Sequence, residues 1–265
     1  ICCSLVGDFG KSLAEVLTKY KPDRVIIEPS GVGKLSDVMK AVRDVAAEIE
    51  VTLNSAVTIV DVAKCRMYMK NFGEFFNNQI ENAGTVVLSR TDIAAVDKVT
   101  PAVELIREKN PAAVIVTTPC SQLSGAQLLE IIEKPDTMAE DLMKEVEEHR
   151  RHHHDHEHGE ACSCGHDHGH HHADEVFTSW GLENVGAMKR EELDRLLDEL
   201  AYGDQYGEVL RAKGMVPGEK EGSWLYFDLV PEQYEIRDGA PEYTGKVCVI
   251  GAKLKENELK KAFGR

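Results

Sequence analysis

Residues able to bind metal ions are concentrated in one internal segment of the chain. All 11 histidines lie between His149 and His172, interleaved with acidic residues and with Cys162-x-Cys164. Neutral imidazole is the commonest protein ligand for transition metals, and thiolates add affinity for zinc-like ions. The composition cannot bury a core and predicts a metal-binding loop. Its candidate ligands are His152, His153, His154, His156, His158, Cys162, Cys164, His166, His168, His170, His171 and His172.

A second candidate metal site lies at the start of the chain, where Cys2 and Cys3 are adjacent. Vicinal thiolates suit Zn²⁺ or another borderline-soft ion, although two ligands cannot complete a tetrahedral site. Taken alone, the pair is more typical of structural cysteines. We expect the isolated cysteines to be small buried residues. The cysteine spacing does not suggest a disulfide framework and indicates a reducing, cytoplasmic environment.

The segment Glu28-Pro29-Ser30-Gly31 follows the apolar run Arg24–Ile27. A carboxylate at the carboxyl end of a parallel strand is where P-loop nucleotidases hold hydrated Mg²⁺. A following glycine lets a backbone N–H approach a γ-phosphate. The pattern predicts a magnesium and phosphate contact, but an ordinary β-to-α turn can contain the same residues.

A second polar loop, Ser89-Arg90-Thr91-Asp92, follows the apolar run Thr85–Leu88. GTPases place the base-binding sequence N-K-x-D at such a position, and its aspartate accepts hydrogen bonds from two guanine N–H groups. Here serine stands for asparagine and arginine for lysine, and arginine can stack on a purine. The alternative is a solvated turn in which Asp92 caps a helix.

The elements that position these loops follow from the apolar pattern. Continuous runs rich in β-branched residues predict strands covered on both faces, and helices are expected between them. The alternation predicts an α/β fold with a doubly wound, mostly parallel sheet. Thr100 is the expected N-cap of the helix that starts at Pro101. The expected strands are Arg24–Ile27, Ala56–Val60, Thr85–Leu88 and Ala113–Val116; the expected helices are Lys11–Tyr20, Leu35–Glu48, Tyr68–Asn82, Pro101–Lys109 and Gly125–Glu133.

A smaller α+β domain is expected after the histidine-rich segment. Leucines at 193, 196, 197 and 200 have the spacing of an amphipathic helix. Strands are expected at Val176–Leu182, Trp224–Val230 and Lys246–Gly251, and a final helix at Glu256–Phe263. The expected domains are therefore 1–139, a histidine-rich linker at 140–174, and 175–265.

Composition excludes two classes of partner. The net charge of −15 argues against a nucleic-acid-binding protein, which needs a basic face. No run approaches the roughly 18 consecutive apolar residues of a membrane helix. We therefore expect neither nucleic acid nor a membrane as a partner.

The order and spacing of these motifs resemble the CobW-like (cobalamin synthesis protein W) family of P-loop GTPases and metallochaperones along nearly the whole chain. The resemblance is carried by Cys2-Cys3, by the Glu28–Gly31 and Ser89–Asp92 segments, and by Leu210-Arg211-Ala212-Lys213-Gly214 with Trp224 near the end. The family's G-x-x-x-x-G-K-[ST] phosphate loop and the first cysteine of its C-x-C-C motif do not occur in these residues. We expect both upstream of Ile1, on a segment of at least about 30 residues.

The resemblance implies a GTPase that delivers a divalent transition metal, zinc or cobalt, to a client metalloprotein. It implies GTP and Mg²⁺ as cofactors, with Glu28 holding the water shell of Mg²⁺ and Gly31 near the γ-phosphate. Ser89, Arg90 and Asp92 would bind the base, and Cys2 and Cys3, with Zn²⁺ or Co²⁺, would form the transfer site. The natural protein would be a GTPase, whereas the chain as given is expected to be inactive.

Two other functions remain open from the sequence. One is a passive metal-storage protein whose GTPase fold is vestigial. The other is a regulatory protein that docks through its C-terminal domain without hydrolysing nucleotide.

Overall fold

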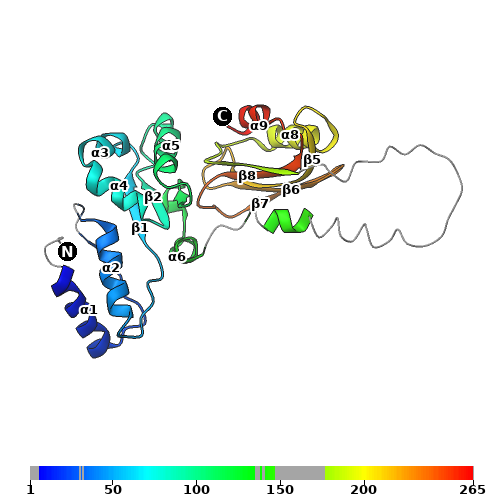
Figure 1. Ribbon diagram of the computed structural model, residues 1–265. Helices are drawn as coiled ribbons and strands as arrows, with labels where there is room; N and C mark the ends of the chain where they lie inside the picture. The colour runs from blue at the N-terminus through cyan, green and yellow to red at the C-terminus, as the bar shows by residue number, and fades with distance from the viewer. Residues whose placement is uncertain are drawn as a thin grey trace, which may run out of the picture. The chain divides into compact units, whose positions relative to one another are not determined.

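The computed structural model describes residues 6–29, 31, 33–134, 138, 141–146 and 177–264, apart from the side chains of residues 6–8 and 96. The chain forms two compact units, Ile1–Asp136 and Thr137–Arg265. Each is described below by itself (Figure 1).

The first unit contains a three-stranded parallel sheet in the order β1–β2–β3, which confirms the predicted α/β class. Its strands are rich in β-branched residues, and Val86, Leu88 and Ile115 pack with helix residues in one buried cluster. The strands are β1 (Val57–Asp61), β2 (Thr85–Ser89) and β3 (Val114–Val116). The helices are α1 (Val6–Tyr20), α2 (Leu35–Ala46), α3 (Cys65–Asn71), α4 (Gly73–Glu81), α5 (Val99–Lys109) and α6 (Gly125–Glu133).

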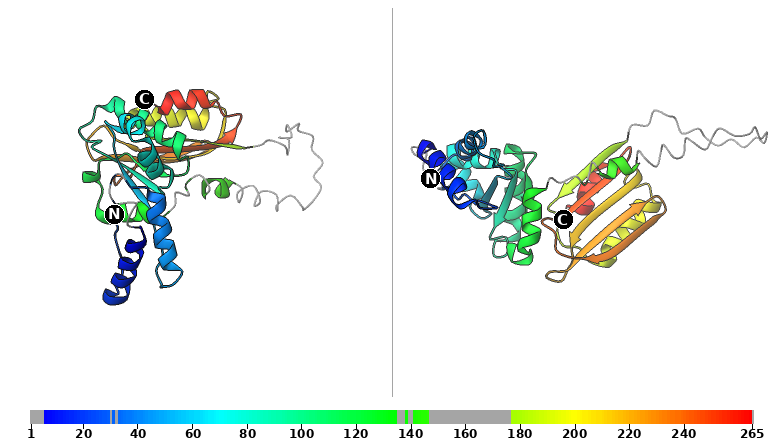
Figure 2. Two further views of the ribbon diagram at one scale, coloured as in Figure 1. Left: turned by 60° about the vertical axis from the view of Figure 1, so that its left-hand side comes forward. Right: turned by 90° about the horizontal axis from the view of Figure 1, so that it is seen from below.

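Helices α1 and α2 lie side by side (Figures 1 and 2). Leu13 of α1 and Val42 and Val45 of α2 form a buried cluster of their own, separate from the one around the sheet. Val25 and Ile27 pack on this cluster from the segment that connects the two helices. The segment that ends in Glu28 is therefore held by the helix pair.

Three sequence predictions for this unit are wrong. The run at Arg24–Ile27 forms no strand, because a strand needs a hydrogen-bonded neighbour and the Ile26 side chain is 89% exposed. The single helix expected at Tyr68–Asn82 is divided at Phe72 into α3 and α4. Helix α5 begins at Val99, after a 3₁₀ turn, so Thr100 is inside the helix and does not cap it.

Asn110 links the end of α4 to the beginning of β3. Its side-chain amide donates hydrogen bonds to the carbonyls of Ile80 and Ala83, each at 2.8 Å. Its carbonyl oxygen accepts from the backbone N–H groups of Ala112 and Ala113, at 3.2 and 3.0 Å. Because Asn110 is only 8% exposed, this side chain satisfies the buried carbonyls of Ile80 and Ala83 and the buried N–H of Ala113.

The second unit is a five-stranded antiparallel sheet in the order β4–β8–β5–β6–β7. Helices α8 and α9 cover one face of it (Figure 1). Leu193, Leu197 and Leu259 from the helices pack against Phe227 and Val249 from the sheet. The elements are β4 (Thr178–Glu183), α8 (Arg190–Tyr202), β5 (Glu208–Pro217), β6 (Trp224–Val230), β7 (Gln233–Gly239), β8 (Lys246–Ala252) and α9 (Glu256–Phe263).

The other face of this sheet is covered in part by the helical residues 141–146. Leu142 and Val146 pack on Cys248 and Ile250 of β8, with Phe177 beside them. Figure 2 shows this short helix lying across the sheet, on the side away from α8 and α9. Val146 and Phe177, which are far apart in the sequence, therefore belong to the same apolar cluster.

The sequence prediction for this unit omitted two of its strands, β5 and β7. Strand β5 carries Arg211 and Lys213 on one side and the small residues Ala212 and Gly214 on the other, so it lacks an apolar run. No helix in the described part of the chain is both long enough and apolar enough to cross a membrane.

Candidate functional site

The carboxyl ends of β1 and β2 lie at the same edge of the parallel sheet, with Asp61 in register with Ser89. The Ser89 hydroxyl donates to the Val60 carbonyl at 3.3 Å, and the Val62 N–H donates to the Ser89 carbonyl at 3.2 Å. Parallel α/β sheets bind ligands at this edge. The sheet therefore places the Ser89–Asp92 loop where a nucleotide site is expected.

An ion pair joins the two strand ends. The guanidinium of Arg90 lies 3.1 Å from Oδ2 of Asp61, while Oδ1 of Asp61 accepts the Ala63 N–H at 3.0 Å. Arg90 has a left-handed backbone, with φ of 63°, which turns the chain away from β2. The Asp61 side chain is 15% exposed and that of Arg90 is 60% exposed, so the pair contributes at most about 1 kcal/mol. The pair places the guanidinium beside the end of β1.

Asp92 occupies the outer side of the turn that follows. The N–H groups of Ile93 and Ala94 both donate to the Arg90 carbonyl, which closes the turn. Asp92 is exposed, and beside it the Ile93 side chain is 77% exposed. Asp92 caps no helix, because α5 begins at Val99 with Lys98 as its N-cap. The helix-capping part of the alternative is therefore wrong, whereas its solvated turn agrees with the exposed position of Asp92.

The loop after Glu28 is held by α4. The Gln79 side chain donates to the carbonyls of Gly31 and Gly33, at 3.1 and 2.9 Å. The preceding residue, Asn78, accepts from the N–H of Ser36 at 3.2 Å and donates to its hydroxyl at 3.1 Å. These four bonds hold the carbonyls of Gly31 and Gly33 and the first turn of α2 against α4.

Space remains open in front of Gly31. A Cβ atom built there would meet no heavy atom within 4 Å, and Glu28 is exposed. Glu28 and Gly31 share no described hydrogen bond or ion pair with the Ser89–Asp92 loop. The two predicted contact groups are thus positioned separately, one by α4 and one by the strand ends.

The predicted metal ligands lie outside the described residues. This applies to Cys2 and Cys3 and to every histidine and cysteine between His149 and His172. Within the described ranges, no group of three or more His, Cys, Asp or Glu residues is arranged to hold a metal ion. Of the described cysteines, Cys65 and Cys248 are buried, and burial raises the pKa of Cys65 to about 11. Cys120 is exposed, contrary to the expectation for isolated cysteines.

Sequence reasoning did not assign roles to three residues that organise this region. These are Asp61, which binds Arg90, and Asn78 and Gln79, which bind the loop after Gly31. The signal available was the position of Asp61 at a strand end. The partners of Asn78 and Gln79 lie more than 40 positions away, and local sequence does not reveal them.

Comparison with protein-family models gives two matches. The model described as "CobW/HypB/UreG, nucleotide-binding domain" matches residues 1–117, and "Cobalamin synthesis protein cobW C-terminal domain" matches residues 177–265. The chain belongs to the CobW-like family of P-loop GTPases. This membership places it among GTPases of the metallochaperone kind.

Two solved structures are similar to the chain. The Zn(II)-bound YjiA GTPase from E. coli is 18% identical, with 95% of this chain and 74% of that chain covered and a TM-score of 0.35. A Zn(II)-bound triple mutant of YjiA GTPase is 19% identical with the same coverage and a TM-score of 0.34. No curated protein is similar enough to the chain to be matched.

Proposed function

We propose that this CobW-like protein binds and hydrolyses GTP and uses the cycle to deliver a divalent transition metal, zinc or cobalt, to a client metalloprotein. The observation that carries the proposal is the position of Asp92. Its carboxylate is exposed at the carboxyl edge of a parallel sheet, on a turn whose own N–H groups are bound to the Arg90 carbonyl. An aspartate placed in this way can accept both guanine N–H groups. The exposed Ile93 beside it offers an apolar surface to a flat base.

The residues around Gly31 support a phosphate contact. Gln79 fixes the loop through the carbonyls of Gly31 and Gly33, and the space beyond Gly31 is open. Glu28 is an exposed carboxylate without a described cationic partner, and this fits Mg²⁺, which keeps several waters and often takes one or two carboxylates. Bound Mg²⁺ would neutralise charge on the phosphates.

The transported metal is assigned to two regions. Cys2 and Cys3 supply thiolates for a tight transfer site. The histidine-rich linker, residues 140–174, supplies many equivalent weak ligands. The cysteine usage supports a cytoplasmic location.

The test changes the nucleotide preference of metal-dependent hydrolysis from GTP to xanthosine triphosphate. In the natural protein, Asp92→Asn should lower GTP affinity roughly 100-fold, because two hydrogen bonds to a charged group together contribute about 3 kcal/mol. Xanthosine triphosphate should replace GTP, since its base offers an acceptor to the new amide. Hydrolysis of both nucleotides is measured with and without Zn²⁺ or Co²⁺.

Asp97→Asn is the matched control, because Asp97 is an exposed aspartate five positions away in the 3₁₀ turn before α5. It should leave nucleotide preference unchanged. Unaltered GTP affinity in the Asp92 variant would remove the base-binding role. Turnover that ignores metal in the unmodified protein would favour passive storage instead.

A further inference from the structure

A groove of about 740 Å³ lies in the first unit between α3 and α5. Pockets that bind small molecules have volumes of about 300–1,000 Å³, so this groove is large enough for a ligand. Its lining includes the buried residues Val62, Cys65 and Ala102. None of the residues assigned above to the nucleotide or to the transported metal is among the described residues that line it.

The wall that α3 contributes is positively charged. Arg66 and Lys70 are exposed and line the groove, and neither side chain has a hydrogen-bond or ion-pair partner among the described residues. They are four positions apart, so they lie on one side of the helix, where like charges repel each other. Lys64 precedes the helix, and α3 itself contains no acidic residue. A bound anion would relieve this repulsion.

The opposite wall carries the carboxylate of the lining. Asp97 belongs to the 3₁₀ turn before α5, and its Oδ2 lies 3.9 Å from Nζ of Lys98, which also lines the groove. The described lining thus has three cations and one carboxylate. Glu104 and Glu108 are the acidic residues of α5 and do not line the groove. Even with these two and Lys64 counted, one positive charge remains in excess.

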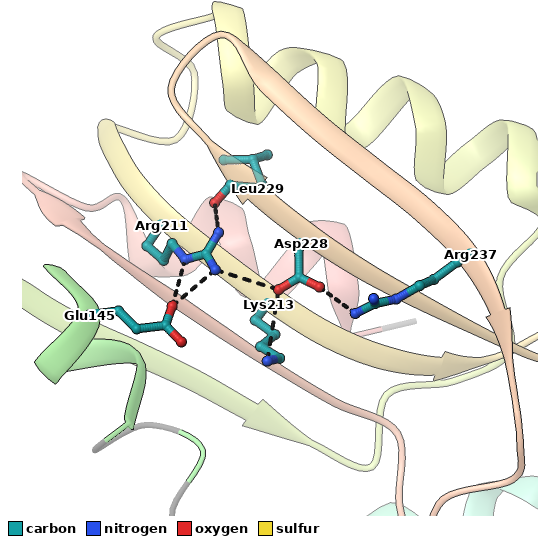
Figure 3. Close-up of polar contacts among 6 residues, drawn as sticks. All are labelled: Glu145, Arg211, Lys213, Asp228, Leu229 and Arg237. Atoms are coloured by element: carbon teal, nitrogen blue, oxygen red, sulfur yellow. Dashed lines mark hydrogen bonds and ion pairs between the residues drawn. The ribbon is translucent and has the colours of Figure 1, made fainter. Parts of the chain in front are cut away.

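The second unit shows how cations are arranged where the fold itself pairs them. Asp228 lies 2.6 Å from Arg237, 3.7 Å from Arg211 and 3.8 Å from Lys213 (Figure 3). No such carboxylate pairs with the two cations of α3 in the described part of the chain. Their charge is therefore available to a ligand.

An apolar surface adjoins these two cations. Met67 follows Arg66 on α3, lines the groove and is 47% exposed. Pro101 and Leu105 of α5 also line the groove and are half-buried. A methionine side chain is flexible and polarisable, so it adapts to ligands of different shape. The groove therefore presents cationic and apolar surface together.

We propose that this groove binds a small organic anion that has an apolar body, with its acidic group at Arg66 and Lys70 and its apolar part between Met67 and Leu105. An inorganic anion would leave the apolar walls in water, and an uncharged ligand would leave the two cations without a partner. The inference does not depend on nucleotide or metal binding, because the described lining shares no residue with either proposed site.

The test uses the chain 1–265 and two fluorescent probes with a similar apolar body. Anilinonaphthalene sulfonate is anionic, and N-phenylnaphthylamine is uncharged; binding of each increases its fluorescence. Arg66→Glu with Lys70→Glu should weaken binding of the anionic probe at least about tenfold, because attraction becomes repulsion at both contacts. Binding of the uncharged probe should change less than about twofold, since its contacts are apolar. Loss of fold would weaken both probes and cannot produce this difference.

The control is Lys260→Glu with Lys261→Glu, an equal change of net charge at exposed positions of α9 in the second unit. It should change binding of either probe less than about twofold, because isolated surface charges contribute little. Met67→Ser removes apolar contact and should weaken both probes to a similar extent. Arg66→Gln with Lys70→Gln provides a milder variant, and circular dichroism verifies that all variants are folded.

Competition identifies the class of ligand. Octanoate should displace the anionic probe, whereas octylammonium and inorganic phosphate at the same concentration should not. Equal weakening of the anionic probe by the reversed and control variants would overturn the proposal, as would phosphate that displaces the probe as well as octanoate does. Stronger displacement by a peptide of alternating glutamate and leucine would overturn it in favour of a protein segment.

Discussion

Replacing Asn110 by aspartate should destabilise the first unit and leave the second unchanged. The exchange preserves volume and keeps the acceptor for the N–H groups of Ala112 and Ala113. It removes both donors to the carbonyls of Ile80 and Ala83, which are buried. Each unsatisfied buried group costs about 1–3 kcal/mol, and an added charge must be buried or protonated. We expect a loss of roughly 3–5 kcal/mol, a large part of the stability of a domain.

The assay follows urea unfolding by circular dichroism and by tryptophan fluorescence. The chain has two tryptophans, Trp180 and Trp224, and both belong to the second unit. The dichroism transition of the first unit should move to lower urea while the fluorescence transition stays in place. Asn82→Asp is the control, since Asn82 gives one part-buried bond to the Asn78 carbonyl and should cost about 1 kcal/mol or less.

The direction in which the stability cost of Asn110→Asp changes with pH can also be checked. A carboxyl group buried against carbonyl oxygens has a pKa in the folded protein above its unfolded value of about 3.9. The cost of Asn110→Asp therefore grows as pH rises from the unfolded toward the folded pKa, so it should be larger at pH 7 than at pH 5. A cost below 1 kcal/mol, or an equal shift of the tryptophan transition, would refute the reasoning.

Two further predictions concern the first unit. Gln79→Ala removes the donors to the carbonyls of Gly31 and Gly33. Amide hydrogen exchange of residues 33–36, measured by mass spectrometry, should therefore become several-fold faster. Unchanged exchange would mean that α4 does not hold the loop. At pH 8, iodoacetamide should alkylate the exposed Cys120 but not Cys65, because burial raises the pKa of Cys65 to about 11. An unfolded cysteine thiol has a pKa of about 8.5. The unfolding free energy should therefore fall as pH rises between these two pKa values.

The strands of the first unit could be predicted because their composition favours strands and each of them pairs with a neighbouring strand. The runs that became β1, β2 and β3 are continuous, β-branched and paired in one sheet. Arg24–Ile27 has the same composition but forms no strand with any described segment, and Val25 and Ile27 pack on the α1–α2 pair instead. Composition measures the tendency of a segment to form a strand, whereas pairing decides whether it does.

The omitted strands of the second unit differ in how much signal they contain. In β7, Tyr234 and Ile236 alternate with Glu235 and Arg237, a period of two that predicts a half-buried strand and could have identified it. In β5, the inward residues Ala212 and Gly214 are too small to give that contrast. The Cβ of any residue at 214 would lie 2.5 Å from the Phe227 ring, so a neighbouring strand, invisible in the local sequence, requires the small residue.

The departures of the Ser89–Asp92 loop from N-K-x-D are explained by the end of β1. The short Ser89 side chain reaches the Val60 carbonyl, and the long Arg90 side chain reaches the Asp61 carboxylate. Both substituted residues therefore use polar groups to join β2 to β1, at a distance that the parallel register sets. The Thr91 hydroxyl is buried without a partner among the described residues. Asp92 is thus the one carboxylate of the loop, and it faces solvent. In the proposed function, Asp92 accepts from the base, while Ser89 and Arg90 in addition connect the end of β2 to the end of β1.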